Sequence, residues 1–187
     1  MIRIALFISG SGSNAENIIK HFKNSENVCI SVVVSDNKDA YGLEMAKKHN
    51  IPNVAYTRAD FLKTDKVFNL LKEENIDFIV LAGFLCFVPE NITKQYEGKI
   101  VNIHPSLLPK YGGKGMYGHF VHEAVVEAKD TESGITIHYV NEKFDDGEII
   151  FQAKCEVLPT DTAADVERKV RALEIKHFPS VIAQILK

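Results

Sequence analysis

Two polar side chains close the apolar segment Val101-Asn102-Ile103-His104, and their types and spacing suit acyl transfer. Residues two apart on a strand face the same way, so Asn102 and His104 are expected to point together. An amide N–H donates to a developing oxyanion, and an imidazole donates as a cation or transfers a proton. The alternative is that both side chains only cap backbone groups at the strand end.

An acidic turn, Phe144-Asp145-Asp146-Gly147, comes later in the chain. A carboxylate beside His104 would stabilise the imidazolium and raise the His104 pKa. Asp-Asp-Gly is also a good turn sequence, and without a family comparison that is the simpler interpretation. The residues alone therefore leave a catalytic role for Asp145 open.

A glycine- and serine-rich loop, Ser9 to Asn14, separates the first apolar run from a helix-period segment. Backbone amides at such a junction point at a ligand, and the helix dipole favours negative charge there. Ser11, Ser13 and Asn14 can add side-chain donors. The loop therefore predicts a phosphate site, and the alternative is a tight turn that needs glycine only for its geometry.

The same loop also matches a dinucleotide-binding fingerprint, Gly10-x-Gly12-x-x-Ala15. Asp36 stands near the end of the second predicted strand, where a ribose-binding acid would lie. A nicotinamide-binding oxidoreductase is therefore the second interpretation. The serines favour a terminal monophosphate instead, and the pattern typical of nucleoside triphosphate hydrolases is absent.

Positioning these groups requires a scaffold, and short apolar runs alternating with helix-period segments predict an α/β fold with a largely parallel sheet. Strands are expected at Ile2–Ile8, Val28–Val34, Val54–Tyr56, Asp77–Leu81, Lys99–Ile103, Gly134–Tyr139 and Glu148–Lys154. Helices are expected at Ala15–Phe22, Gly42–Lys48, Asp65–Glu74, Glu90–Tyr96, Phe120–Ala128 and Thr162–Leu186.

The last two strands are too close in sequence for a crossover helix, so they predict an antiparallel hairpin. The expected fold is Rossmann-like: a mixed, largely parallel sheet flanked by helices, with the hairpin at the C-terminal end. Residues 1–187 are expected to form a single domain. Ligands in such sheets gather at the carboxyl ends of the strands, where the candidate residues stand.

Composition excludes several classes of function. The 187 residues are 45% hydrophobic and 25% charged, with a formal net charge of −3 and interleaved signs, so no nucleic-acid partner is expected. No apolar run suits a membrane span or a signal peptide, which predicts a cytoplasmic protein. The scattered cysteines, Cys29, Cys86 and Cys155, predict buried thiols rather than disulfides or zinc.

Taken together, the chain resembles the folate-dependent formyltransferases along nearly its whole length. The resemblance rests on Ile8 to Asn14, Val80-Leu81-Ala82-Gly83-Phe84, the string from Asn102 to Tyr111, Asp145-x-Gly147 and Glu174. The Asn-x-His-Pro-Ser-Leu-Leu-Pro string is highly specific for this family. The resemblance implies direct formyl transfer from 10-formyltetrahydrofolate, as co-substrate, to the amine of glycinamide ribonucleotide, without a metal. A monomer or weak dimer is expected.

Residue roles follow from the resemblance by position. It implies that Asn102, His104 and Asp145 form the catalytic triad, in which Asn102 and protonated His104 stabilise the oxyanion and Asp145 keeps His104 charged. It implies that Gly12, Ser13 and Asn14 bind the acceptor's phosphate and that Glu174 holds its amine. The implied folate-binding residues are Leu85, Cys86, Phe87, Val88, Asn102 and Val140. Cys86 stands where some relatives carry an arginine, so the resemblance assigns no side-chain role there.

Other members of this family remain as alternatives. A formyltetrahydrofolate hydrolase would use the same triad to transfer the formyl group to water, but normally carries a regulatory domain before the first core strand. A methionyl-tRNA formyltransferase would need an additional tRNA-binding domain. The oxidoreductase interpretation explains the first loop but leaves Asn102 and His104 without a role.

Overall fold

The computed structural model describes all residues from Met1 to Lys187, which form two compact units, Met1–Val101 and Asn102–Lys187. Elements of the first unit are β1 (Ile2–Ile8), α1 (Ser13–Phe22), β2 (Val28–Ser35), α2 (Tyr41–Lys48), β3 (Asn53–Ala55), α3 (Arg58–Lys63), α4 (Lys66–Glu73), β4 (Phe78–Leu81) and α5 (Glu90–Gln95). Strand β5 (Ile100–His104) crosses the boundary, and α6 (His119–Glu127), β6 (Glu132–Tyr139), β7 (Ile149–Glu156) and α7 (Ala163–Ile185) follow.

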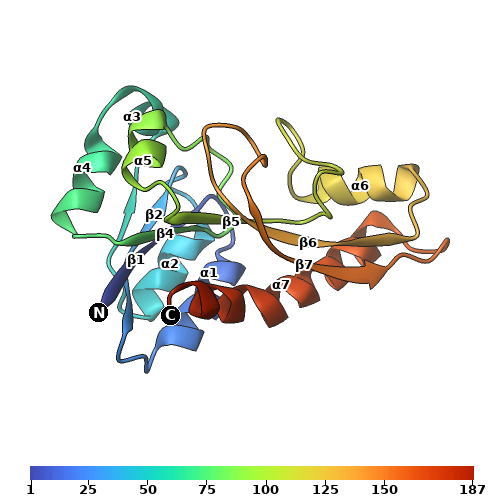
Figure 1. The fold of residues 1–187 in the computed structure, drawn as a ribbon, viewed down its shortest axis with the longest axis horizontal. Coiled ribbons are helices and arrows are strands. Elements are labelled where there is room, and N and C mark those ends of the chain that lie inside the picture. Colours follow the sequence, from blue (N-terminus) through green and yellow to red (C-terminus); the bar gives the residue numbers. More distant parts are fainter. The chain divides into compact units, whose positions relative to one another are not determined.

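The first unit is built on parallel strands in the order β3-β2-β1-β4. Its central strands are buried along nearly their whole length, as parallel strands covered on both faces are. Phe7 of β1 packs edge-on against Phe61 of α3, with ring centroids 5.7 Å apart, while its neighbour Ile8 approaches Gly42 of α2. Helices α2 and α3 lie on opposite sides of the strands (Figure 1), so these adjacent β1 residues contact different layers.

The second unit begins with the last residues of β5. Strands β6 and β7 pair antiparallel, with Ile135 opposite Ala153, and β5 neighbours β6. Helix α7 packs against both hairpin strands and against α6 (Figure 1). It begins with a capping box, in which the Thr162 hydroxyl accepts from the Asp165 N–H and the Asp165 carboxylate accepts from the Thr162 N–H.

The predicted fold class is confirmed: parallel α/β order comes first and an antiparallel hairpin comes last. One helix, α3, is absent from the prediction, although α5 has the same length of 6 residues and is predicted. The α3 capping box of Thr57 and Asp60 was the signal present in the sequence. The expectation of three buried cysteines is wrong for Cys29 and Cys155, which are partly exposed.

None of the helices combines the length and the apolar character that crossing a membrane requires.

Candidate active site

Four side chains of the second unit form a connected polar cluster. The Asn102 amide nitrogen lies 3.2 Å from His138 Nε2, and that atom lies 3.6 Å from Asp145 Oδ1. The other carboxylate oxygen of Asp145 lies 3.5 Å from His104 Nδ1. The structure therefore brings the three predicted catalytic residues together, with His138 between Asn102 and Asp145.

Both ring nitrogens of His104 face acceptors. Its Nε2 lies 2.7 Å from the Tyr111 carbonyl, which can only accept, so Nε2 carries a proton. Burial lowers the pKa of His104, while the Asp145 carboxylate and the Tyr111 carbonyl raise it and the nearby His138 lowers it further. The net direction is downward. Asp145 acts in the predicted sense, but the prediction of a raised pKa is wrong because the ring is only 5% exposed.

Asp145 lies in the connection between β6 and β7 with a positive φ of 51°. Its Oδ2 accepts from the Gly113 N–H at 2.9 Å. Burial raises the pKa of this carboxyl, but the neighbouring His138 and His104 and the Gly113 N–H outweigh burial, and the net direction is downward. Asp145 is therefore an anion at neutral pH, held against both imidazoles.

The backbone from Tyr111 to Gly113 holds the cluster from the other end. Tyr111 offers its carbonyl to His104, and Gly113 offers its N–H to Asp145. Tyr111 has a φ of 54°, and its hydroxyl donates to Asp130 at 2.9 Å, so the strained backbone is anchored at the side chain. A Cβ on Gly112 would lie 2.6 Å from Leu108 Cδ2, which explains glycine at that position.

The phosphate-loop residues belong to the first unit. Gly12 is the N-cap of α1 in the left-handed conformation, with a φ of 75°. Ser13 and Asn14 open the helix, at the positive end of its dipole. Gly12 and Gly42 approach closely, since a Cβ on Gly12 would lie 2.6 Å from the Gly42 Cα. The loop therefore has the form of an anion site.

Ser9 holds together the ends of three strands. Its hydroxyl donates to Asp36 Oδ1 at 2.5 Å and accepts from the Leu85 N–H at 2.8 Å. Arg58 donates to the other Asp36 oxygen at 3.3 Å, and the Asp36 side chain is only 2% exposed. Both carboxylate oxygens are thus occupied by the protein, which counts against the ribose-binding role that the oxidoreductase interpretation requires.

The predicted folate-binding stretch follows this Ser9 contact. Leu85 is exposed, Phe87 is partly exposed, and Cys86 and Val88 are buried. Burial raises the pKa of the Cys86 thiol, so it stays protonated and packs as a small apolar group. Two further predicted residues, Val140 after β6 and Glu174 on α7, lie partly exposed in the second unit.

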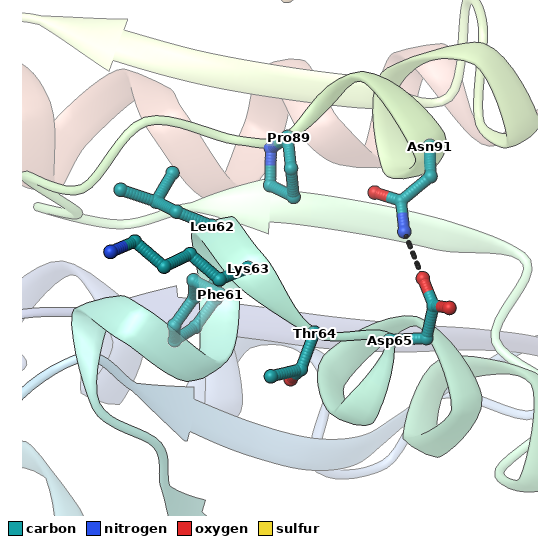
Figure 2. A pocket seen from close by; sticks show the side chains of 7 residues that line it. All are labelled: Phe61, Leu62, Lys63, Thr64, Asp65, Pro89 and Asn91. Carbon is teal, nitrogen blue, oxygen red and sulfur yellow. Dashed lines mark hydrogen bonds between the residues drawn. The ribbon is translucent and has the colours of Figure 1, made fainter.

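A cavity of about 220 Å³ opens in the first unit, and Figure 2 shows its lining. It is formed by α3, the turn into α4 and the start of α5, and an Asn91–Asp65 hydrogen bond of 2.9 Å spans part of the lining. None of the predicted site residues lines it. No group of three or more His, Cys, Asp or Glu side chains is placed to hold a metal ion.

His138 is the site residue that sequence reasoning missed. Thr136 and His138 alternate with Ile135 and Ile137 in strand β6, and all four are buried. Residues two apart share a face, so this alternation was a signal that the face meets a polar neighbour. Only the fold shows that the neighbour of His138 is Asn102.

Comparison with known proteins adds three findings. The family model described as formyl transferase matches residues 2–182. A phosphoribosylglycinamide formyltransferase from Haemophilus influenzae is 39% identical, over 97% of this chain and 86% of that protein. The crystal structure of glycinamide ribonucleotide transformylase 1 from Geobacillus kaustophilus matches with a TM-score of 0.91 and 32% identity, over 100% of this chain and 100% of that chain. The crystal structure of phosphoribosylglycinamide formyltransferase from Anaplasma phagocytophilum matches with a TM-score of 0.90 and 36% identity, over 99% of this chain and 86% of that chain.

Proposed function

This chain belongs to the formyl transferase family, and from that premise we propose that it transfers the formyl group of 10-formyltetrahydrofolate to the amine of glycinamide ribonucleotide. This reaction is a step of purine biosynthesis. The observation that supports it best is the cluster of Asn102, Asp145 and the buried His104, in which two donors and an anion converge. Such preorganised donors suit an acyl transfer through an oxyanion.

The two substrates are assigned to different segments. The acceptor's phosphate binds the N–H groups of Gly12, Ser13 and Asn14 at the start of α1, and Glu174 holds its amine. The pterin binds the Leu85–Val88 stretch and Val140. The stretch holds two buried apolar residues and its first N–H is fixed by Ser9, which supports a backbone-rich pterin contact.

The chemistry is a direct displacement. The neutral acceptor amine attacks the formyl carbon, a C–N bond forms, and the carbonyl electron pair moves to oxygen. Asn102 and His104 donate N–H groups to this oxyanion. The intermediate then collapses as the bond to N10 breaks, and the proton lost by the attacking amine passes to N10. Orientation and oxyanion stabilisation supply much of the barrier reduction.

His104 acts in this scheme mainly as a neutral donor. Because its pKa is lowered by burial, the free protein holds a neutral ring with the proton on Nε2. The same Nε2–H donates to Tyr111 in the free protein, so the oxyanion must share or replace that carbonyl. Asp145, 3.5 Å from Nδ1, opposes this effect of burial because its negative charge raises the pKa of His104.

Purified protein incubated with 10-formyltetrahydrofolate, with and without glycinamide ribonucleotide, tests the proposal. We expect release of tetrahydrofolate and formylated product only when the ribonucleotide is present. His104→Ala and Asp145→Asn should abolish release, while Asp146→Asn, at the exposed neighbouring position, should retain it. Equal release without the ribonucleotide would identify a hydrolase instead.

Three further parts of the proposal come from the sequence. Residues 1–187 act as one formyltransferase domain, which is supported by a single family model that spans both units. The protein is a monomer or weak dimer. It works in the cytoplasm on small-molecule substrates.

A further inference from the structure

We propose that His138 is a positioning residue that fixes the amide orientation of Asn102, so that the amide N–H groups rather than the carbonyl serve the reaction. The inference rests on the proposed function, since it assigns Asn102 to the oxyanion. His138 is 2% exposed and contacts Asn102 and Asp145. It is a buried titratable side chain that the transfer scheme does not otherwise use.

The tautomer of His138 follows from its other ring nitrogen. Nδ1 lies 2.8 Å from the carbonyl of Tyr139, and a carbonyl can only accept, so Nδ1 carries a proton. In a neutral ring Nε2 is then a bare lone pair. The atom of Asn102 that faces it at 3.2 Å must therefore be the amide nitrogen, which donates.

This constraint matters because an asparagine amide has no orientation of its own. Its oxygen and nitrogen have nearly the same shape, so packing alone does not select between them. Because Nε2 of His138 can only accept, the Asn102 amide donates one of its hydrogens to it. The second N–H of Asn102 remains for the oxyanion. The flipped amide would place two lone pairs against each other at His138, in a buried site where that is costly.

The neighbouring carboxylate sets the competing arrangement. Asp145 Oδ1 lies 3.6 Å from His138 Nε2, farther than the Asn102 amide nitrogen at 3.2 Å, so an unprotonated Nε2 has Asn102 as its nearer partner. A proton on Nε2 would reverse this: Nε2 would donate toward Asp145, and the amide of Asn102 would lose its acceptor. The arrangement therefore requires His138 to keep Nε2 unprotonated.

Nitrogen NMR of the uniformly labelled wild-type protein tests the tautomer directly. We expect His138 to show a protonated Nδ1 and an unprotonated Nε2 at neutral pH. A protonated Nε2 would overturn the inference. Because this measurement needs neither a variant nor substrate, it stands whether or not the proposed transfer reaction is correct.

A double-mutant cycle tests whether His138 acts on the reaction through Asn102. His138→Phe should lower kcat by about 10- to 100-fold with little change in either KM, as loss of a supporting partner does at a preorganised site. In an Asn102→Ala background the same substitution should have almost no further effect, because the amide it orients is gone.

An equal loss from His138→Phe in the Asn102→Ala protein would contradict the proposal and indicate a general packing role. Circular dichroism of each variant checks folding, and the tautomer measurement decides the matter if His138→Phe does not fold. An inactive wild-type protein that nevertheless shows the expected tautomer would refute the proposed function and leave the orientation of Asn102 established.

Discussion

At the residue scale, the protonation of His104 is decided by competing neighbours. Burial lowers its pKa, Asp145 and the Tyr111 carbonyl raise it, and burial dominates. The carboxylate therefore does not produce a permanently charged ring. It reduces the cost of placing a positive charge on a buried ring.

An NMR titration should place the pKa of His104 below its ordinary value of about 6.5. Asp145→Asn should lower it further, because the substitution removes the negative charge that opposes burial. Asp146→Asn, beside it and more exposed, is the matched control and should leave the titration unchanged. A His104 pKa that rises in Asp145→Asn would show that the carboxylate does not act on this ring.

At the scale of elements, the chain holds its loops by close backbone approach and by single polar side chains. Gly12 and Gly42 let α1 and α2 meet beside the first loop. Thr136 of β6 fixes the exit of β5, since its hydroxyl donates to the Ser106 carbonyl at 2.7 Å and accepts from the Leu108 N–H at 2.9 Å. Loops held in this way lose little conformational entropy when a ligand binds.

Gly12→Ala should destabilise the protein by about 1–3 kcal/mol, because the new methyl group meets backbone and the left-handed conformation disfavours it. The KM for the phosphorylated acceptor should rise as the loop shifts. Urea unfolding and initial rates measure the two effects. Gly10→Ala is the control, since a Cβ there has nothing within 4 Å; equal effects in both variants would argue against the close approach as the cause.

Asp36→Asn should raise the KM for 10-formyltetrahydrofolate by about 2- to 10-fold, the equivalent of one weakened hydrogen bond. The reason is that Asp36 orients the Ser9 hydroxyl, and this hydroxyl accepts the first N–H of the predicted pterin stretch. The KM for the ribonucleotide should change less. Arg58→Gln keeps the Ser9 contact and serves as the comparison. A selective rise in the KM for the ribonucleotide would instead indicate that the hydrogen bonds of Ser9 with Asp36 and Leu85 serve acceptor binding.

At the scale of the whole molecule, each unit has its own part of the proposed reaction. The first unit holds the predicted phosphate loop and the predicted pterin stretch, and the second holds the predicted catalytic residues. The second unit also buries two neutral histidines, His104 and His122, whose pKa values burial lowers. His122 Nδ1 is buried without a hydrogen-bond partner.

These histidines predict a loss of stability in acid. A folded-state pKa below the unfolded value means that the unfolded chain binds more protons. The contribution of these histidines to the free energy of unfolding is therefore present above about pH 6.5 and is lost as pH falls through the folded pKa. Free energies of unfolding measured in urea should therefore decrease from pH 7.5 to pH 5.5. His122→Phe should show a shallower decrease and be at least as stable at pH 7.5, because it removes an unsatisfied buried nitrogen. Identical slopes for both proteins would rule out His122 as a source.

The sequence by itself determined what depends on neighbours along the chain. The apolar runs predicted the strands, the short span from Gly134 to Lys154 predicted the hairpin, and two-residue spacing predicted that Asn102 and His104 act together. Helix α3 was not predicted, although α5, also of 6 residues, was.

Only the tertiary structure decided which distant groups meet. Asn102 and His138 lie 36 residues apart in sequence, and Ser9 and Leu85 lie 76 apart, so neither contact leaves a local pattern. Burial is likewise a property of the folded molecule: it leaves His104 neutral where the sequence predicted a charged ring. Electrostatic effects depend on desolvation as much as on the nearest charge, and desolvation is set by the packing of the whole chain around the site.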